Sequence, residues 1–308
     1  MVVASLVFGI LLMTYSSTKA IEHSVQFASA MRFPPLLIGL VLLSIGTNLP
    51  EIVNSIVSSA VGHADVNIGD SLGSILSQTT LVLGLIPFLG TAFKVERKEI
   101  LVLGAIQVSS LLAVLFAIQL GLTPLYAFLL IISWPVIMFF LYSTSSLTPK
   151  KVKNVIQTDK HHLLHLITAC FYFLGVSIGA VVVVESVIML STELLVPEFL
   201  LSFFVLGIGT SLPELVVNVQ AFRKKQYELV IGDAIGSCIV DALISIPIGP
   251  LFFPIAVTNN ISLTMGFYVV FASIVAIMVL AWREIVDRKA GLLLTILYFL
   301  SFTMIFVI

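Results

Sequence analysis

The sequence has little charge for its length. Only 10% of its 308 residues are Asp, Glu, Lys or Arg, whereas 59% are hydrophobic; an average soluble domain has about 25% charged residues. So few charges cannot cover the surface of a water-soluble globular protein, which excludes a soluble enzyme. The net charge of −1 leaves no basic surface for nucleic acid. The two cysteines, Cys170 and Cys238, lie in apolar stretches, where we expect both to be buried rather than to form a disulfide or zinc framework.

Ten apolar segments are long enough to cross a membrane. A helix of about 20 apolar residues spans the hydrocarbon core, and continuous runs of this length favour helices over the alternating strands of a β-barrel. The predicted spans are 2–20, 34–61, 66–91, 100–119, 124–143, 163–190, 198–222, 228–249, 262–282 and 290–308. The sequence therefore predicts an all-α integral membrane protein with ten transmembrane helices in contact with the lipid bilayer.

The basic residues predict the orientation of these spans. All 15 Lys and Arg residues lie in or beside the loops after the first, third, fifth, seventh and ninth spans, and the other four loops have none. Loops rich in Lys and Arg stay in the cytoplasm. We therefore expect a multi-pass protein of the cell membrane with both termini outside and the 144–162 linker in the cytoplasm.

Two segments of the chain repeat. Residues 34–87 align with 197–250 without a gap, at an offset of 163, and 16 of the 54 aligned positions are identical. Most identities fall in G-T-x-L-P-E (46–51 and 209–214) and in I-G-D-x-x-G-S (68–74 and 231–237). The repeats predict two five-span halves, 1–143 and 163–308. Because five is odd, the second half enters the membrane from the opposite side, which is the inverted-repeat plan of secondary transporters.

Five acidic residues fall inside the predicted spans of these repeats, and no Lys or Arg lies at the same depth. They are Glu51, Asp70, Glu214, Asp233 and Asp241. A charge at membrane depth costs about 2.5–3.5 kcal/mol on insertion scales, so such residues usually mark ion pathways. Anions without a basic partner require a bound cation or a proton. Because five carboxylates exceed the charge of one Ca²⁺, we predict that Asp70, Asp233 or Asp241 holds a proton or an auxiliary ion.

Polar side chains accompany the glutamates at helical spacing, which places them on shared helix faces. The predicted cation ligands are Ser44, Thr47, Asn48, Glu51, Ser74, Gln78, Thr210, Ser211, Glu214, Ser237 and Asp241. Pro50 and Pro213 disrupt the preceding turn, so we expect locally unwound helices with free carbonyls near 44–46 and 207–209. Ligands that are all oxygen select hard cations, and Ca²⁺ tolerates irregular geometry better than Mg²⁺. Zinc or copper would need a His or Cys cluster, which the predicted spans lack.

The paired motifs resemble the alpha-repeats of the cation/calcium antiporter superfamily, most closely its prokaryotic sodium/calcium exchanger branch. The resemblance implies that Glu51 and Glu214 bind Ca²⁺. It also implies calcium or sodium binding around the threonines and serines of both motifs: Thr47, Thr210, Ser74 and Ser237. The sequence departs from the family pattern at Asn48 (usually Ser), Asp70 and Asp233 (usually Asn), Ile75 and Cys238 (usually Asn), and Gln78 (usually Asn or Asp).

The implied function is a secondary antiporter that exchanges Ca²⁺ for Na⁺ by alternating access. The first and sixth spans would move against the second, third, seventh and eighth. We expect no cofactor apart from the transported ions, and a chain that functions as a monomer. A Ca²⁺/H⁺ antiporter, an exchanger of Mg²⁺ or another divalent cation, and a cation channel remain alternatives. An intramembrane hydrolase would need an aspartyl dyad, for which Asp70 and Asp233 are the candidates.

Overall fold

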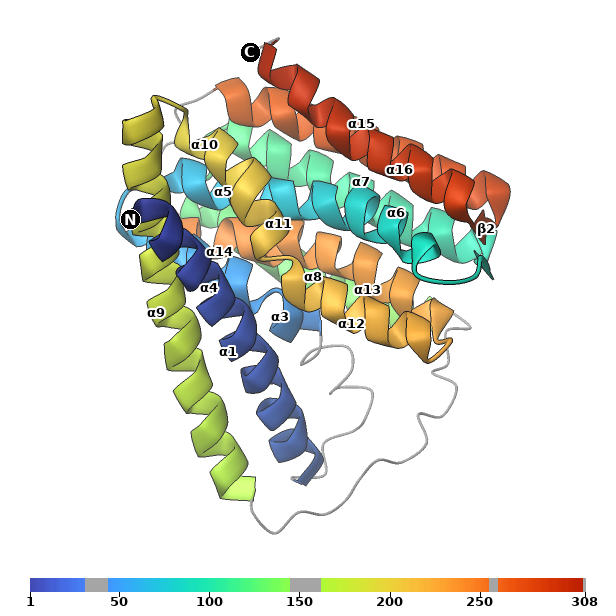
Figure 1. Cartoon of the computed structure of the whole chain (residues 1–308), viewed down its shortest axis with the longest axis horizontal. Helices are drawn as coiled ribbons and strands as arrows, with labels where there is room; N and C mark the ends of the chain where they lie inside the picture. The colour runs from blue at the N-terminus through green and yellow to red at the C-terminus, as the bar shows by residue number, and fades with distance from the viewer. Residues whose placement is uncertain (31–43, 145–161, 255–259, 307–308) are drawn as a thin grey trace.

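The first half of the chain forms helices α1 to α8 (Figure 1). The computed structural model describes residues 1–30, 44–144, 162–254 and 260–306. The helices of this half are α1 (Val2–Ala30), α3 (Ser44–Thr47), α4 (Leu49–Ala60), α5 (Ala64–Leu76), α6 (Leu83–Leu85), α7 (Arg97–Gln119) and α8 (Pro124–Thr144). Between α5 and α6 lies the π-helical turn η2 (Ser77–Val82), and the 3-10 turn η3 (Ile86–Phe88) follows α6.

The second half repeats this order. Its helices are α9 (His162–Leu194), α10 (Glu198–Leu201), α11 (Gly207–Gly209), α12 (Leu212–Arg223), α13 (Tyr227–Val240), α14 (Ile246–Phe252), α15 (Asn260–Arg283) and α16 (Arg288–Leu300). The π-helical turns η4 (Ser202–Leu206) and η5 (Asp241–Ser245) interrupt it, and the 3-10 turn η6 (Ser301–Phe306) follows α16. The shared order confirms the predicted all-α fold built from two repeats.

Nine helical segments of the described residues are long and apolar enough to cross a membrane. They correspond to nine of the ten predicted spans. The remaining span, predicted at 34–61, contains α3 and α4, and its residues 34–43 lie outside the described residues. Helix α1 extends beyond the predicted end of the first span at residue 20 and continues to Ala30. Lys19 and Glu22 lie inside this helix and neutralise each other at 2.7 Å, so their charges do not end it.

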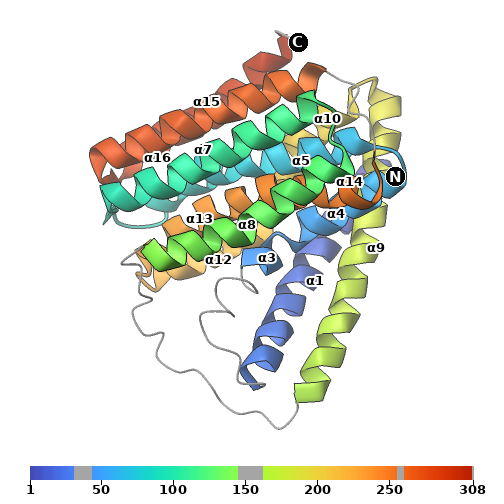
Figure 2. The same ribbon diagram turned by 180° about the vertical axis from the view of Figure 1, so that it is seen from behind.

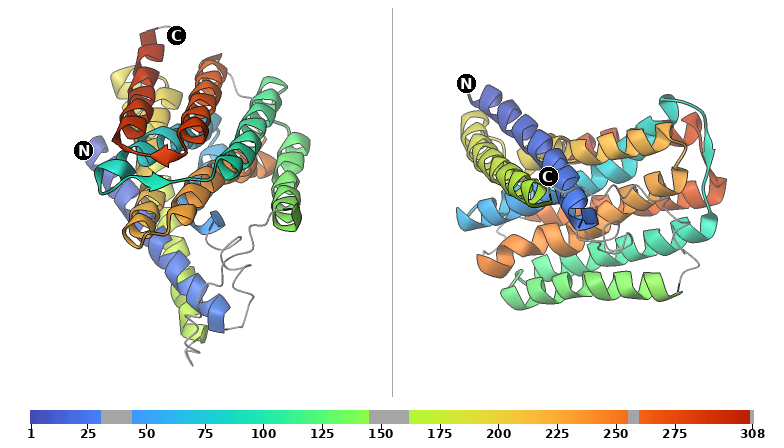
Figure 3. Two further views of the ribbon diagram at one scale, coloured as in Figure 1. Left: turned by 90° about the vertical axis from the view of Figure 1, so that its right-hand side faces the viewer. Right: turned by 90° about the horizontal axis from the view of Figure 1, so that it is seen from below.

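The helices form two groups. The helices α1 and α9 pack along each other and are inclined to the remaining helices, which run roughly parallel (Figures 1 and 3). Helices α7, α8 and α15 cover the face opposite α10 to α12 (Figure 2). The broken helices α3–α4 and α11–α12, together with α5 and α13, therefore lie between the α1–α9 pair and the outer helices.

Contacts between loops agree with the predicted sides of the membrane. Strand β1 (Phe93–Lys94), after the third span, pairs antiparallel with β2 (Ile285–Val286), after the ninth. Both loops carry basic residues and were predicted to be cytoplasmic. On the other side, His63 Nδ1 lies 2.8 Å from a carboxylate oxygen of Glu198, which joins the loops after the second and sixth spans. The short β pair is an addition to the predicted all-helical fold.

The burial of the two cysteines differs. Cys238 is fully buried, as predicted, whereas Cys170 is exposed on the surface of α9. The prediction for Cys170 is therefore wrong. An apolar stretch of a membrane helix has a face toward lipid as well as a face toward the protein, and composition alone does not distinguish them.

Candidate functional site

Two helix interruptions precede the glutamates. Helix α3 ends at Thr47 and α4 begins at Leu49, with Asn48 between them at φ −81° and ψ 14°. In the second half α11 ends at Gly209 and α12 begins at Leu212, after Ser211 at φ −76° and ψ 3°. Proline occupies the first turn of both following helices, where its missing N–H is tolerated. The interruptions therefore lie just before each Leu-Pro pair, slightly later than the predicted positions near 44–46 and 207–209.

Glu51 and Glu214 lie in the first turns of α4 and α12 and are fully buried. They are close enough for their charges to interact. Oε1 of Glu51 accepts a hydrogen bond from Ser74 Oγ at 3.2 Å. Its Oε2, and both carboxylate oxygens of Glu214, have no hydrogen-bond partner in the described part of the chain. The sequence motif thus brings two carboxylates from opposite repeats to one interior region.

A chain of hydroxyl groups connects the two repeats beside Glu51. Ser74 Oγ lies 2.7 Å from Ser211 Oγ, which is 3.0 Å from Ser77 Oγ. Ser77 and Ser211 both donate to the Gly207 carbonyl oxygen, at 2.9 and 2.7 Å. This carbonyl, which we expected to be available to a cation, is therefore already hydrogen-bonded within the protein. The sequence analysis missed Ser77; only its place among the polar residues 70–80 could have indicated it.

Glycine residues allow this close approach. A Cβ atom added at Gly73 would lie 2.1 Å from the Phe203 carbonyl oxygen, and one added at Gly207 would lie 2.4 Å from the Gly73 carbonyl carbon. Both distances are too short for any side chain. The glycine of the first G-D-x-x-G-S motif therefore lets α5 contact the backbone of η4 and α11 directly.

The two motif aspartates have different environments. Asp70 is buried and accepts hydrogen bonds at both oxygens, from Thr210 Oγ1 at 2.8 Å and from Asn54 Nδ2. Asp233 is partly exposed and accepts one bond, from Asn218 Nδ2 at 2.9 Å. Asp70 thus connects the first repeat to the helix interruption of the second, and it positions the Thr210 hydroxyl.

Gln78 and Asp241 lie in the π-helical turns η2 and η5. Gln78 Nε2 donates to Ser74 Oγ at 2.9 Å, and Asp241 Oδ1 accepts from Ser245 Oγ at 3.0 Å. Asp241 Oδ2 has no partner among the described residues. A π-helical turn is often found at a functional site, but nothing in the sequence predicted these turns.

Most of the remaining predicted ligands are also buried. Thr47, Asn48 and Ser237 are buried, and Ser44 is the first residue of α3. No Lys or Arg among the described residues is buried, so the interior carboxylates have no basic partner there. No three His, Cys, Asp or Glu side chains in the described ranges converge as a metal cluster. A cation in this region would therefore need hydroxyl, amide or carbonyl oxygens in addition to carboxylates.

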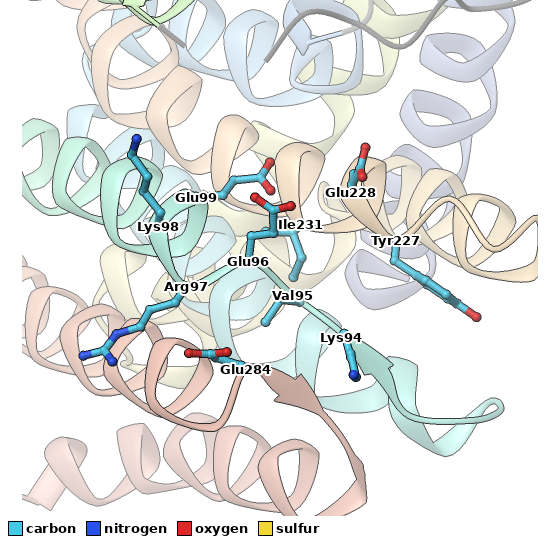
Figure 4. A pocket seen from close by; sticks show the side chains of 10 residues that line it. All are labelled: Lys94, Val95, Glu96, Arg97, Lys98, Glu99, Tyr227, Glu228, Ile231 and Glu284. Carbon is cyan, nitrogen blue, oxygen red and sulfur yellow. The ribbon is translucent and has the colours of Figure 1, made fainter. Parts of the chain in front are cut away.

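A separate hollow of about 590 Å³ lies between the β1–α7 turn, the start of α13 and the end of α15. The carboxylates of Glu96 and Glu99 lie next to each other in it, with Glu228 nearby, whereas Arg97 and Lys98 extend away (Figure 4). None of these residues was a predicted ligand. The hollow is on the predicted cytoplasmic side and does not include the buried glutamates.

The architecture and the buried acids together define a class of protein. It is a multi-pass helical membrane protein in which each of two repeats has a broken helix followed by a buried glutamate, an arrangement typical of secondary transporters. The sodium/calcium exchanger protein family matches residues 1–143 and 164–307. The chain belongs to this family, which confirms the resemblance of the motifs. The family consists of transporters, not enzymes, so the hydrolase alternative is excluded.

Relatives of this chain share most of its length. Inner membrane protein YrbG of Escherichia coli is 26% identical over 95% of this chain and 93% of its own. The sodium/calcium exchanger MaX1 of Methanosarcina acetivorans is 24% identical over 98% of both chains. A structure of the sodium-calcium exchanger NCX_Mj, soaked with 100 mM Na⁺ and 10 mM Sr²⁺, is 25% identical, with a TM-score of 0.64 over 98% of this chain and 99% of that one. The chain is thus similar to cation antiporters throughout its length.

Proposed function

We propose that this cation antiporter exchanges Ca²⁺ for Na⁺ by alternating access. Glu51 and Glu214 are the proposed Ca²⁺ ligands. The other proposed ligands of Ca²⁺ or Na⁺ are Ser44, Thr47, Asn48, Ser74, Gln78, Thr210, Ser211, Ser237 and Asp241. The names of MaX1 and NCX_Mj as sodium/calcium exchangers support both ions.

The observation that carries this proposal is the uncompensated charge at Glu214. Both of its carboxylate oxygens are buried and have no partner among the described residues, and its charge interacts with that of Glu51. A buried carboxylate without a hydrogen bond or counter-ion is strongly unfavourable. A divalent cation between two carboxylates would balance both charges and occupy the unpartnered oxygens.

The same charge explains why transport would be coupled. An empty site with several carboxylates cannot cross the low-dielectric interior, because an uncompensated charge there is costly. Ca²⁺ or several monovalent cations would neutralise the site and permit reorientation. The proposed moving elements are α1 and α9, which pack along each other and are inclined to the helices of the site (Figure 3).

A Ca²⁺/H⁺ antiporter is the second candidate. The observation that favours it is the number of interior acids, since Asp70, Asp233 and Asp241 are present in addition to the two glutamates. One Ca²⁺ balances only two of these five charges, so protons are natural partners for the others. We propose Asp70, Asp233 and Asp241 as the residues that hold a proton or an auxiliary ion.

The proposal includes the orientation and the functional unit. Both termini are placed outside the cell membrane and the 144–162 linker in the cytoplasm, because every basic residue lies on that side. A single chain supplies both glutamates of the site, so we propose that the monomer transports ions.

Countertransport in proteoliposomes tests the function. Vesicles containing the purified chain are loaded with Na⁺, or with choline and an outward proton gradient, and ⁴⁵Ca²⁺ uptake is measured. Na⁺-dependent uptake that falls at least about tenfold, or about 1.4 kcal/mol, in both Glu51→Gln and Glu214→Gln supports Ca²⁺/Na⁺ exchange. Glu96→Gln is the matched control, since this carboxylate lies in the separate hollow. Uptake driven only by the proton gradient favours Ca²⁺/H⁺ antiport, and full activity in both interior variants contradicts the site.

A further inference from the structure

A contact between ionisable side chains joins the two repeats on the predicted outer face. His63, in the turn between α4 and α5, has its Nδ1 atom 2.9 and 2.8 Å from the two carboxylate oxygens of Glu198, in the first turn of α10. An ionised carboxylate only accepts hydrogen bonds, so Nδ1 is the donor. The two side chains are 34% and 20% exposed, so protons from the medium can reach the imidazole. We call this pair the outer contact.

The charge of His63 affects the strength of the outer contact. Asp65, at the start of α5, is a second acidic side chain whose charge interacts with both His63 and Glu198. The predicted outer loops contain no Lys or Arg, so neither competes with His63 for these carboxylates. Histidine changes its charge between pH 5 and 8, and its protonation adds the attraction of opposite charges to the hydrogen bond. Acid therefore strengthens the outer contact.

Glu198 lies close to the end of α9, one of the proposed moving helices. Helix α9 ends at Leu194 and α10 begins at Glu198. Two hydrogen bonds close the turn between them, from Ser191 Oγ to the Val196 carbonyl oxygen at 2.6 Å and from the Val196 N–H to the Ser191 carbonyl oxygen at 3.2 Å. This turn couples the start of α10 to α9. A movement of α9 along the helices of the site would therefore carry Glu198 away from His63.

The outer side of the structure is closed, whereas the inner side is more open. Helix α10 and η4 pack on α5, where a Cβ atom added at Gly69 would lie 2.5 Å from the Phe199 carbonyl oxygen and Asp70 is 1% exposed. At the equivalent positions of the second repeat, a Cβ atom added at Gly232 would meet no atom of the described residues within 4 Å, and Asp233 is partly exposed. The outer contact therefore belongs to a conformation that is closed toward the outside.

We propose that the outer contact is a latch that holds the outer side closed and that protonation of His63 strengthens it. Acid outside the cell then favours the conformation that external cations cannot enter. A ligand that binds only the open conformation loses apparent affinity in proportion to the fraction of molecules that is closed. External acid therefore raises the concentration of external Ca²⁺ that half-saturates uptake. This inference rests on the proposed Ca²⁺ transport, which supplies the readout.

Permanent charges at position 63 test the latch at one pH. Right-side-out membrane vesicles from cells that express the chain are loaded with Na⁺, and ⁴⁵Ca²⁺ uptake is measured against external Ca²⁺, with vesicles lacking the chain as the blank. At pH 8 the half-saturating Ca²⁺ concentration should be about fivefold higher in His63→Arg, which is always charged, than in His63→Gln, which is never charged. This ratio corresponds to about 1 kcal/mol, as expected for a partly exposed ion pair. Adding Glu198→Gln to His63→Arg should restore the lower value.

The wild-type chain should behave like one variant at each end of the pH range. Its half-saturating Ca²⁺ concentration, divided by that of His63→Gln at the same pH, should be close to 1 at pH 8 and rise toward five at pH 5.5. The ratio removes the effect of protonation of the interior carboxylates, because both proteins contain them. Asp65→Asn is the matched control, since it removes a neighbouring charge and leaves the outer contact intact. It should change half-saturation by less than about twofold.

Hydrogen exchange of the purified chain gives a second readout that does not require transport. At one pH, the backbone amides of residues 198–206 should exchange more slowly in His63→Arg than in His63→Gln, and adding Glu198→Gln to His63→Arg should remove this difference. Equal exchange in the two single variants overturns the inference, and so does equal half-saturation.

The sign of the effect of Glu198→Gln at pH 5.5 separates a latch from simple attraction of Ca²⁺ to acidic side chains. Release of a latch should lower the half-saturating Ca²⁺ concentration about fivefold. Loss of an attracting carboxylate would raise it, and that result also overturns the inference. If wild-type vesicles show no Na⁺-dependent Ca²⁺ uptake, the proposed function fails, and the hydrogen-exchange comparison still decides whether the latch exists.

Discussion

The contact of Gly73 with η4 makes Gly73→Ala a stringent test of the packing between the repeats. The added Cβ would lie 2.1 Å from the Phe203 carbonyl oxygen, whereas ordinary contact begins at 3.4 Å. The neighbour is backbone, so no side-chain rotation can relieve the clash. Helix α5 and η4 would therefore have to separate by about 1.3 Å, the difference between these two distances.

Three contributions to the free energy of unfolding determine whether Gly73→Ala stabilises or destabilises the protein. Alanine gains about 1 kcal/mol over glycine in helix propensity. Overpacking costs about 1–3 kcal/mol. The separation would also break the bond from Ser77 to the Gly207 carbonyl and the bond between Ser74 and Ser211, now 2.9 and 2.7 Å, at about 1 kcal/mol each. We expect a net destabilisation of about 2–4 kcal/mol, together with loss of the hydroxyl chain beside Glu51.

The assay compares Gly73→Ala with Ser71→Ala on the same helix. Ser71 is buried and its hydroxyl has no partner among the described residues, so its replacement creates the same side chain without a clash. Thermal aggregation of the detergent-solubilised protein, followed by size-exclusion chromatography, should occur at a clearly lower temperature for Gly73→Ala. Its ⁴⁵Ca²⁺ uptake should be lost even below that temperature. If both variants melt together and transport equally, the reasoning is refuted.

Three further predictions concern protons, a helix cap and orientation. Ca²⁺ binding by the purified chain should weaken as the pH falls from 9 to 6, because protons compete with Ca²⁺ for the interior carboxylates. A Ca²⁺ dissociation constant that does not change over this range would contradict the prediction that an interior aspartate holds a proton. The Ala290 N–H donates to Asp287 at 2.9 Å and, with Arg283, lowers the pKa of this carboxyl. The ionised Asp287 carboxylate therefore stabilises the fold above the ordinary pKa of aspartate, and this stabilisation is lost as the pH falls through the lowered pKa. Asp287→Ala should reduce the free energy of unfolding by about 1 kcal/mol at neutral pH, measured by thermal unfolding. In a Cys170→Ser background, a membrane-impermeant thiol reagent added to whole cells should label His63→Cys and not Lys94→Cys; the reverse pattern would invert the proposed orientation.

The sequence was sufficient to predict the features that depend on local chemistry. Apolar length located the spans, and Pro50 and Pro213 placed the helix interruptions to within a few residues. The burial of Glu51 and Glu214 followed from their place in apolar segments without basic residues. These predictions succeeded because each depends on a short stretch of chain and on the cost of a polar group in lipid.

The π-helical turns could not be predicted in this way. The turns η2 at 77–82 and η5 at 241–245 coincide almost completely at the repeat offset of 163, yet the residues that form them differ between the repeats. Each π-helical turn adds a residue to the helix and rotates the residues after it. Spacing rules for a regular helix placed Gln78 on one face with Ser74, and the two side chains are hydrogen-bonded. The same rules placed Asp241 with Ser237, but its hydrogen bond is to Ser245, four residues further along the chain.

The differences between the repeats have two separable origins. Asp70 and Asp233 are identical residues at equivalent positions, so their unequal hydrogen bonding reflects the conformation of the chain and its neighbours. In an inverted repeat, each half is expected to adopt the arrangement of the other when the site opens to the opposite side. Thr47 and Asp233 should then form the bond now made by Thr210 and Asp70. The bond from Gln78 to Ser74 has no such counterpart, because Asp241 cannot donate as an amide does. An asymmetry that comes from a difference in sequence, such as Gln78 against Asp241, would therefore persist through the transport cycle.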